Sequence, residues 1–260
     1  AGILIYMFIF IFGAQVMRGV IEEKTNRIVE IIVSSVKPFQ LMMGKILGLA
    51  LVGLTQFLLW VILTFAIVSV FQVTYADQIP KENLTQMVPG QEQIIVQDEE
   101  IQSDDQQQNV AKAFEIIRSI DFGVMIFGFL FYFLFGYLLY AALFAAIGSA
   151  SDTEVDTQQF MLPVSIPLFL SIVMAQFVMR YPDGPLAFWF SIIPLTSPVI
   201  MMVRIPFGVP YWELYLSMFL LILGFLGTTW LAGKIYRTGI LMYGKKINYK
   251  EIWKWLKYRS

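Results

Sequence analysis

Two adjacent acids and an arginine near the start of the chain have types and spacing that could do chemistry. Glu22, Glu23 and Arg27 form the pattern Glu-Glu-x-x-x-Arg, and paired carboxylates can activate a water molecule when histidines complete the site. The sequence contains no His and no Cys, so it lacks the commonest general base, the commonest metal ligand and the thiol nucleophile. We therefore expect no catalytic residue, no metal site and no cofactor.

The dipeptide Gly44-Lys45 is the second candidate, because Gly-Lys ends the phosphate-binding loop of many ATPases. That loop needs another Gly five residues earlier and a Ser or Thr after the lysine, whereas Phe39 and Ile46 occupy these positions. The sequence thus lacks this nucleotide-binding motif. Gly44 and Gly48 instead have the spacing that lets two membrane helices approach closely.

The composition is that of an integral membrane protein. Hydrophobic residues make up 58% of the chain and charged residues only 14%, whereas soluble domains carry roughly 25% charged residues. A helix needs about 20 apolar residues to span a bilayer. Runs of this kind occupy residues 1–20, 42–73, 122–148, 160–179 and 212–233. We predict an all-α bundle of five transmembrane helices, and the net charge of −1 gives no reason to expect a nucleic-acid partner.

A further apolar segment, residues 186–208, contains Pro194, Pro198 and Pro206. Cytoplasmic loops carry an excess of Lys and Arg, and this excess indicates whether the segment crosses the membrane. Without a crossing, thirteen of the 18 Lys and Arg lie on the cytoplasmic side, whereas a crossing leaves six inside and twelve outside. We predict a re-entrant or interfacial helical hairpin, with an ordinary proline-kinked span as the alternative.

The predicted hairpin has its turn at Pro194 to Pro198 and contains one charge, Arg204. We expect Arg204 at the outer headgroup level, because a long arginine side chain can keep its head in water while its stem covers apolar surface. The hairpin would act as an outer gate that narrows an exit path, or it would be a plug that only packs against neighbouring spans.

Two charged regions lie outside the predicted spans. Residues 75–121 hold ten acidic residues against three Lys or Arg, which predicts a solvated extracytoplasmic loop. Residues 234–260 hold eight Lys or Arg, which predicts a basic cytoplasmic tail. The sequence begins with Ala1 inside an apolar run, so we expect it to be N-terminally truncated.

Between the first two spans, residues 21–38 form an amphipathic segment. On a helical wheel its apolar residues share one face, and Glu23, Arg27 and Glu30 lie on the opposite face. Arg27 is four residues from Glu23 and three from Glu30, so it can pair with either acid. We predict one helix, ended by Pro38, with its charged face free to pair with itself or to bind a cytoplasmic partner.

The order of these features resembles the ABC-2 type transporter permeases, and most closely their sodium-efflux (NatB-like) branch. The run RGVIEEKTNRIVEIIVSSVKPFQLMMGKILG is similar to the family's loop after its second span. The run IIPLTSPVIMMVRIPFG resembles the family's segment between its last two spans, and LAGKIYRTGILMYGKKINYKEIWKWL resembles its C-terminal end. The likeness covers nearly all of residues 1–260.

The resemblance implies six spans with both ends in the cytoplasm, of which this chain would lack the first. It implies that residues 21–38 are a coupling helix, which docks on a separate cytoplasmic ABC ATPase subunit that hydrolyses the ATP. The residues carried over for that contact are Glu22, Glu23, Arg27, Glu30, Pro38 and Lys45. It further implies a dimer with a second permease copy, in the cell membrane of a bacterium (the inner membrane).

The implied function is that of the permease subunit of an ATP-binding cassette exporter, which moves a substrate such as sodium ions out of the cell. Gln15, Gln56 and Gln176 lie within spans and either line the path or hydrogen-bond between helices. A non-transporting membrane scaffold is the alternative. A secondary carrier is a further alternative. Carriers often place ionisable residues in mid-membrane, whereas the interiors of the spans predicted here have essentially none. The intramembrane CAAX-type proteases share Glu-Glu-x-x-x-Arg but need the histidines that this sequence lacks.

Overall fold

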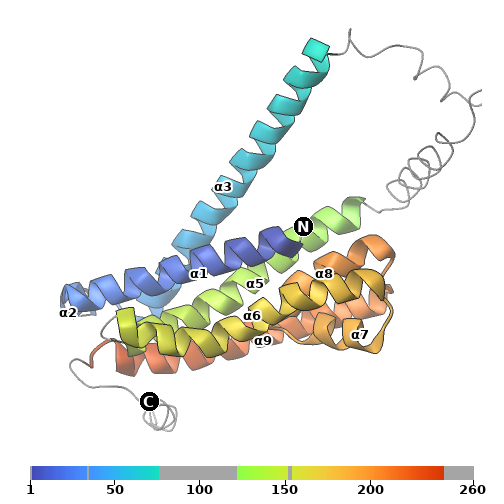
Figure 1. Ribbon diagram of the computed structural model, residues 1–260. Coiled ribbons are helices and arrows are strands. Elements are labelled where there is room, and N and C mark those ends of the chain that lie inside the picture. The colour runs from blue at the N-terminus through green and yellow to red at the C-terminus, as the bar shows by residue number, and fades with distance from the viewer. Residues whose placement is uncertain (1, 34, 76–121, 152–153, 243–260) are drawn as a thin grey trace, which may run out of the picture. The chain divides into compact units, whose positions relative to one another are not determined.

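The computed structural model describes residues 2–33, 35–75, 122–151 and 154–242 (Figure 1). The predicted acidic loop, apart from Tyr75, and the basic tail beyond Met242 lie outside these residues. The elements are α1 (Gly2–Thr25), α2 (Ile28–Val33), α3 (Pro38–Tyr75), α5 (Phe122–Ala150), α6 (Glu154–Arg180), α7 (Pro185–Ile192), α8 (Ser197–Arg204), the 3-10 helix η4 (Ile205–Phe207) and α9 (Tyr211–Gly239).

Five helices are long and apolar enough to cross a membrane, as the sequence predicts. These spans are Gly2–Thr25, Pro38–Leu63, Gly123–Ala150, Asp156–Arg180 and Tyr211–Gly239. The described residues contain no strand, and the all-α membrane bundle is thereby confirmed.

The chain divides into two units, residues 1–53 with 120–260 and residues 54–119. The second unit is described only over the later part of α3. Large apolar side chains such as Leu58, Trp60 and Ile62 are exposed on it, as expected for a helix surrounded by lipid. The first unit contains the start of α3 and all the other helices among the described residues.

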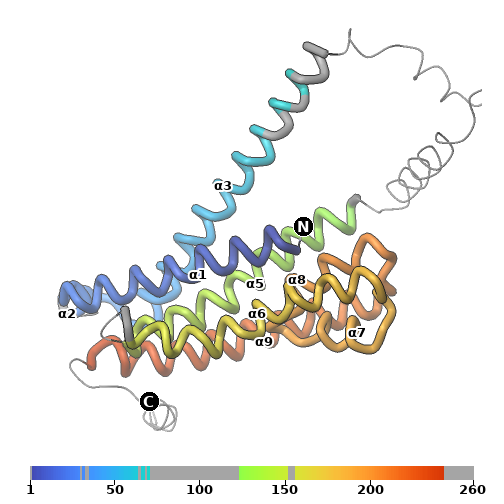
Figure 2. Tube along the Cα trace, viewed as in Figure 1, coloured from blue at the N-terminus to red at the C-terminus, as the bar shows by residue number. Residues whose placement is uncertain are grey.

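Within the first unit α5 is the central helix, and α1 and α9 lie along it (Figures 1 and 2). The α5 span is 72% buried, whereas the α6 and α9 spans are 22% and 28% buried. The sequence of α5 explains its position, because Ala141, Ala142, Ala145 and Ala146 leave room for neighbouring helices. Helices α7 and α8 lie at the end of α1 opposite α2 (Figure 1).

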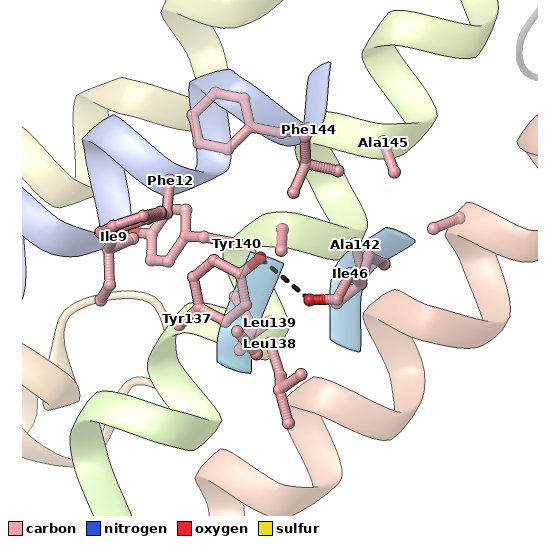
Figure 3. Close-up of a cluster of buried hydrophobic side chains, with 14 of the residues drawn as sticks. Ile9, Phe12, Ile46, Tyr137, Leu138, Leu139, Tyr140, Ala142, Phe144 and Ala145 are labelled. Atoms are coloured by element: carbon pink, nitrogen blue, oxygen red, sulfur yellow. Dashed lines mark hydrogen bonds between the residues drawn. The ribbon is translucent and has the colours of Figure 1, made fainter. Parts of the chain in front are cut away.

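Close contacts tie α1, α3 and α9 to the C-terminal half of α5. A Cβ atom at Gly148 would lie 2.7 Å from the Met17 carbonyl oxygen of α1, and one at Gly239 of α9 would lie 2.8 Å from the Ser149 carbonyl oxygen. The Tyr137 hydroxyl donates a 3.1 Å hydrogen bond to the Ile46 carbonyl in the first turns of α3 (Figure 3). Helices α1, α3 and α9 therefore all contact the same half of α5.

The predicted close approach at Gly44 and Gly48 is not made within the chain. A Cβ atom at either position would meet nothing within 4 Å among the described residues. Both glycines lie in the N-terminal part of α3, and both are exposed.

The prediction of one helix over residues 21–36, ended by Pro38, is wrong. Helix α1 continues to Thr25, Asn26 and Arg27 form a turn, and α2 has only six residues. Arg27 adopts a φ of 55°, in the left-handed region. Thr and Asn favour helix ends because their side chains compete for backbone hydrogen bonds. Pro38 begins α3 because the first helical position needs no amide donor.

We expect Gly148→Ala to lower the stability of the purified protein by about 1–3 kcal/mol, since the new methyl group must push α1 away from α5. The matched control is Gly227→Ala in α9, where a Cβ would meet nothing within 4 Å among the described residues. The better helix propensity of Ala should leave that variant unchanged or more stable. Thermal unfolding in detergent measures both, and equal effects would contradict the proposed contact.

Candidate functional site

The predicted coupling residues gather where α1, α2 and α3 meet, and we call residues 22–38 with Lys45 the α1–α3 junction. The Lys45 Nζ lies 2.7 Å from the Glu23 Oε2, and the lysine side chain runs alongside Gly19. The two side chains are only 13% and 26% exposed, so water screens their attraction less than that of a surface pair. This ion pair attaches the end of α1 to the start of α3.

Arg27 was predicted to lie four residues after Glu23 on one helix and to pair with it. In the structure Arg27 lies in the turn between α1 and α2 instead. The left-handed turn removes the four-residue helical spacing, and Glu23 pairs with Lys45 instead. Arg27 itself is exposed, as is Glu22. Glu30 falls in α2, and its side chain lies outside the described part of the chain.

Lys24 is a residue of this junction that sequence reasoning missed. It is 1% exposed, and its Nζ donates a 2.8 Å hydrogen bond to the Ser149 carbonyl in the last turn of α5. A positive group there satisfies a carbonyl that has no partner within the helix and complements the helix dipole. Extending the helical wheel from the first span would have found it, because Lys24 follows Val20 by four residues on the buried face of α1.

The other side of the junction is open. Ile31 of α2 is 75% exposed, and the basic residues Arg27 and Lys37 are exposed on either side of α2. The junction thus combines attachment to the bundle with an exposed outer face.

The predicted hairpin consists of α7 and α8, joined at residues 193–196, and we call residues 185–204 the α7–α8 hairpin. Pro194 lies against Gly224 of α9, where a Cβ atom would be 2.6 Å from the Pro194 Cβ. Pro198 lies against Gly136 of α5 in the same way, at 2.8 Å. Both glycines are near the middle of their helices, so the turn lies level with the middle of these spans.

Side chains satisfy the backbone groups that this turn leaves without helical partners. The Tyr140 hydroxyl donates to the Leu195 carbonyl at 2.6 Å, and the Thr196 Oγ1 donates to the Phe190 carbonyl at 2.6 Å. The Ser217 Oγ of α9 donates to the Ser191 carbonyl, also at 2.6 Å. Irregular backbone is tolerated at membrane depth where the protein supplies such partners.

Helix α8 fills the centre of the bundle at this end. Val199, Ile200, Met201 and Met202 are each at most 2% exposed. The helix packs against α1, α5, α6, α7 and α9. By contrast, α7 keeps an open face on which Trp189 is 60% exposed.

The prediction that Arg204 keeps its head in water is wrong. Arg204 is 2% exposed, and its Nη1 lies 2.8 Å from the Glu213 Oε2 in the first turn of α9. The same Nη1 donates to the Ser191 Oγ at 2.7 Å, and the Nε donates to the Pro182 carbonyl at 2.8 Å. Arg204 can be buried because a carboxylate neutralises its charge and acceptors satisfy its N–H groups.

The three glutamines predicted to line a path lie on surfaces of the described chain. Gln15 of α1, Gln56 of α3 and Gln176 of α6 are all exposed. Within the first unit, neither Gln15 nor Gln176 faces the core that surrounds α5. The structure therefore brings together the junction residues Glu23 and Lys45, and separately the hairpin residues, but not the glutamines.

Comparison with known proteins gives a family match over most of the chain. Residues 1–234 match the family described as ABC-2 family transporter protein. Two similar curated proteins are Uncharacterized protein YhaP of Bacillus subtilis (strain 168) and Uncharacterized protein MJ1024 of Methanocaldococcus jannaschii, each 26% identical over 250 residues. The alignments cover 96% of this chain and 52% and 51% of those proteins, so it spans about half their length. No solved structure matches.

We expect the Glu23–Lys45 ion pair to stabilise the junction measurably. Glu23→Lys and Lys45→Glu each place like charges together and should lower the unfolding temperature. The double variant restores the pair and should recover at least half of the loss, with a coupling energy of about 1–3 kcal/mol. Arg180→Glu is the control, because this charge reversal at an exposed residue at the end of α6 should change stability by less than about 0.5 kcal/mol. Additive effects of the two reversals would show that the pair does not hold α1 to α3.

Proposed function

Since this chain belongs to the ABC-2 family of transporter proteins, we propose that it is the permease subunit of an ABC exporter driven by a separate ATPase subunit. Its family and its five apolar helices make it a multi-pass membrane protein. The observation that carries the proposal is the α1–α3 junction, whose inner residues are bonded to two spans while its outer face stays open.

The contacts of the junction support a role in coupling. Glu23 binds Lys45 of α3, and the next residue, Lys24, binds the end of α5. A displacement of α2 by a docked ATPase would therefore reach α3 and α5 together. Because α5 also packs against α1, α8 and α9, the displacement would pass into the centre of the bundle.

We place the junction and the basic tail in the cytoplasm, and the loop between α6 and α7 outside. The excess of Lys and Arg near the junction and in the tail supports this orientation. The α7–α8 hairpin is then re-entrant from the outer side. Its two ends lie at the same end of the bundle, because the Arg204 Nε binds the Pro182 carbonyl.

The substrate path is proposed to lie between two copies of the permease. The centre of the described bundle is filled by α8 and the apolar side chains around α5, whereas Gln15, Gln56 and Gln176 are exposed and could face a second copy. In that arrangement the hairpin, with Pro194 in its turn and Pro198 at the start of α8, would close the outer end of the path. Sodium ions are the substrate suggested by the resemblance of the coupling segment.

The coupling proposal predicts that an affinity-tagged permease recovers an ATPase subunit from its native membrane, and that Arg27→Glu reduces this recovery several-fold. Arg27 is exposed and glutamate keeps the same left-handed strain, so insertion should not change. The matched control is Arg180→Glu, an exposed arginine at the other end of the bundle, which should leave recovery unchanged.

Transport is tested by measuring ATP-dependent uptake of radioactive sodium into inside-out vesicles. The vesicles are made from the same native membranes, with the unchanged permease or with either variant. Loss of uptake in step with ATPase recovery would support coupled sodium export. Recovery of an ATPase without sodium uptake would reject sodium as the substrate. Recovery of no ATPase at all would favour a membrane scaffold.

The orientation predicts the accessibility of single cysteines in this Cys-free chain. Asp183→Cys before the hairpin and Tyr211→Cys after it are both at exposed positions and should react with an impermeant maleimide from outside. Lys37→Cys at the junction should react only after the membrane is permeabilised. If Asp183→Cys and Tyr211→Cys reacted from opposite sides, the segment 186–208 would cross the membrane.

A further inference from the structure

Arg204 joins four separate parts of the chain through one side chain. It lies at the end of α8 and binds the Pro182 carbonyl after α6, the Ser191 Oγ of α7 and the Glu213 carboxylate of α9. A planar guanidinium has donors that point in several fixed directions, whereas a lysine offers one compact ammonium group. The geometry therefore requires arginine rather than any positive charge.

The bonds of Arg204 continue into the hairpin. The Ser191 Oγ that accepts from Arg204 donates in turn to the Phe188 carbonyl at 2.8 Å, and the Ser191 carbonyl accepts from Ser217 of α9. Helices α7, α8 and α9 thus share one buried polar network, which extends to Ser191 beside the turn of the hairpin. Proline–glycine packing and the Tyr140 hydroxyl also hold the turn.

We propose that Arg204 is a positioning residue that latches the α7–α8 hairpin inside the bundle, so that α8 stays in the centre only while the Arg204 bonds are intact. A separation of the outer end of α6 from that of α9 would pull the Pro182 carbonyl and Glu213 apart, and Arg204 contacts both. Opening of the bundle at this end therefore requires the latch to break. The contacts that form the latch do not depend on the proposed transport function. Only the role of the latch in transport rests on that function.

A buried cysteine in α8 reports whether the latch is closed. Val199 is 0% exposed, and Val199→Cys is a nearly volume-conserving change in a chain with no other cysteine. In otherwise unchanged protein, this cysteine should react slowly with N-ethylmaleimide. Adding Arg204→Lys or Glu213→Gln should raise the rate at least tenfold, because lysine lacks the several fixed donors of arginine and glutamine leaves the buried guanidinium without a counter-charge.

A second reporter separates a latch from general stabilisation. Ala145 in the core around α5 is also 0% exposed, and Ala145→Cys should stay protected in the same latch variants. Arg180→Lys, an exposed arginine at the end of α6, is the matched control and should change neither rate. Ser191→Ala, which removes one acceptor of Arg204, should raise the Val199→Cys rate by a smaller factor.

Labelling is measured without ATPase or substrate, so its outcome does not depend on whether the chain transports anything. Exposure of Val199→Cys alone would support the latch. Equal exposure of Val199→Cys and Ala145→Cys would mean that Arg204 only stabilises the whole fold, and the proposal would be overturned. Continued protection of Val199→Cys in both latch variants would overturn it as well.

Discussion

The close approach of other helices to α5 is the constraint on which the rest of the described first unit depends. Lipid is as apolar as the helix surfaces, so helices associate through close contact and hydrogen bonds rather than through exclusion of water. Small residues of α5 provide that contact, with Gly148 against the backbone of α1 and Gly136 against Pro198 of the hairpin. As a result, the α1–α3 junction and the α7–α8 hairpin are attached to different parts of the same helix, because Lys24 binds Ser149 in its last turn and Tyr140 near its middle binds Leu195 of the hairpin.

Several polar side chains within the spans satisfy structural needs. Ser149, Ser171 and Thr228 donate to carbonyls three residues earlier in their own helices. Tyr140 and Ser217 instead satisfy carbonyls of the hairpin. A polar residue in a span of this chain is therefore weak support for a substrate path unless it is exposed, as the three glutamines are.

Sequence patterns predicted the features that depend on local chemistry. Apolar run length gave the five spans, and Pro194 and Pro198 gave the break between α7 and α8. The partners of charged residues could not be predicted from local patterns. Lys24 donates to the Ser149 carbonyl, which is 125 residues away in the sequence, and Arg204 pairs with Glu213 in the next helix. The break at Arg27 was missed because amphipathic periodicity continues across Asn26, although Asn is a poor helix former. Hydrophobic periodicity reports which face is buried but not whether the backbone is continuous.

The two ends of the bundle are held by ion pairs that differ in burial. At the junction, Glu23 and Lys45 keep 26% and 13% of their side-chain surface exposed, whereas Glu213 and Arg204 keep 12% and 2%. An ion pair with less access to water is less screened, and separating its members leaves a buried charge without a partner. The junction end can therefore rearrange more readily than the hairpin end. Under the proposed coupling, a force applied at α2 would first move the ends of α1 and α3, and it would reach α8 through α5 at Gly136 and Pro198 and through α1 at Gly2 and Val199.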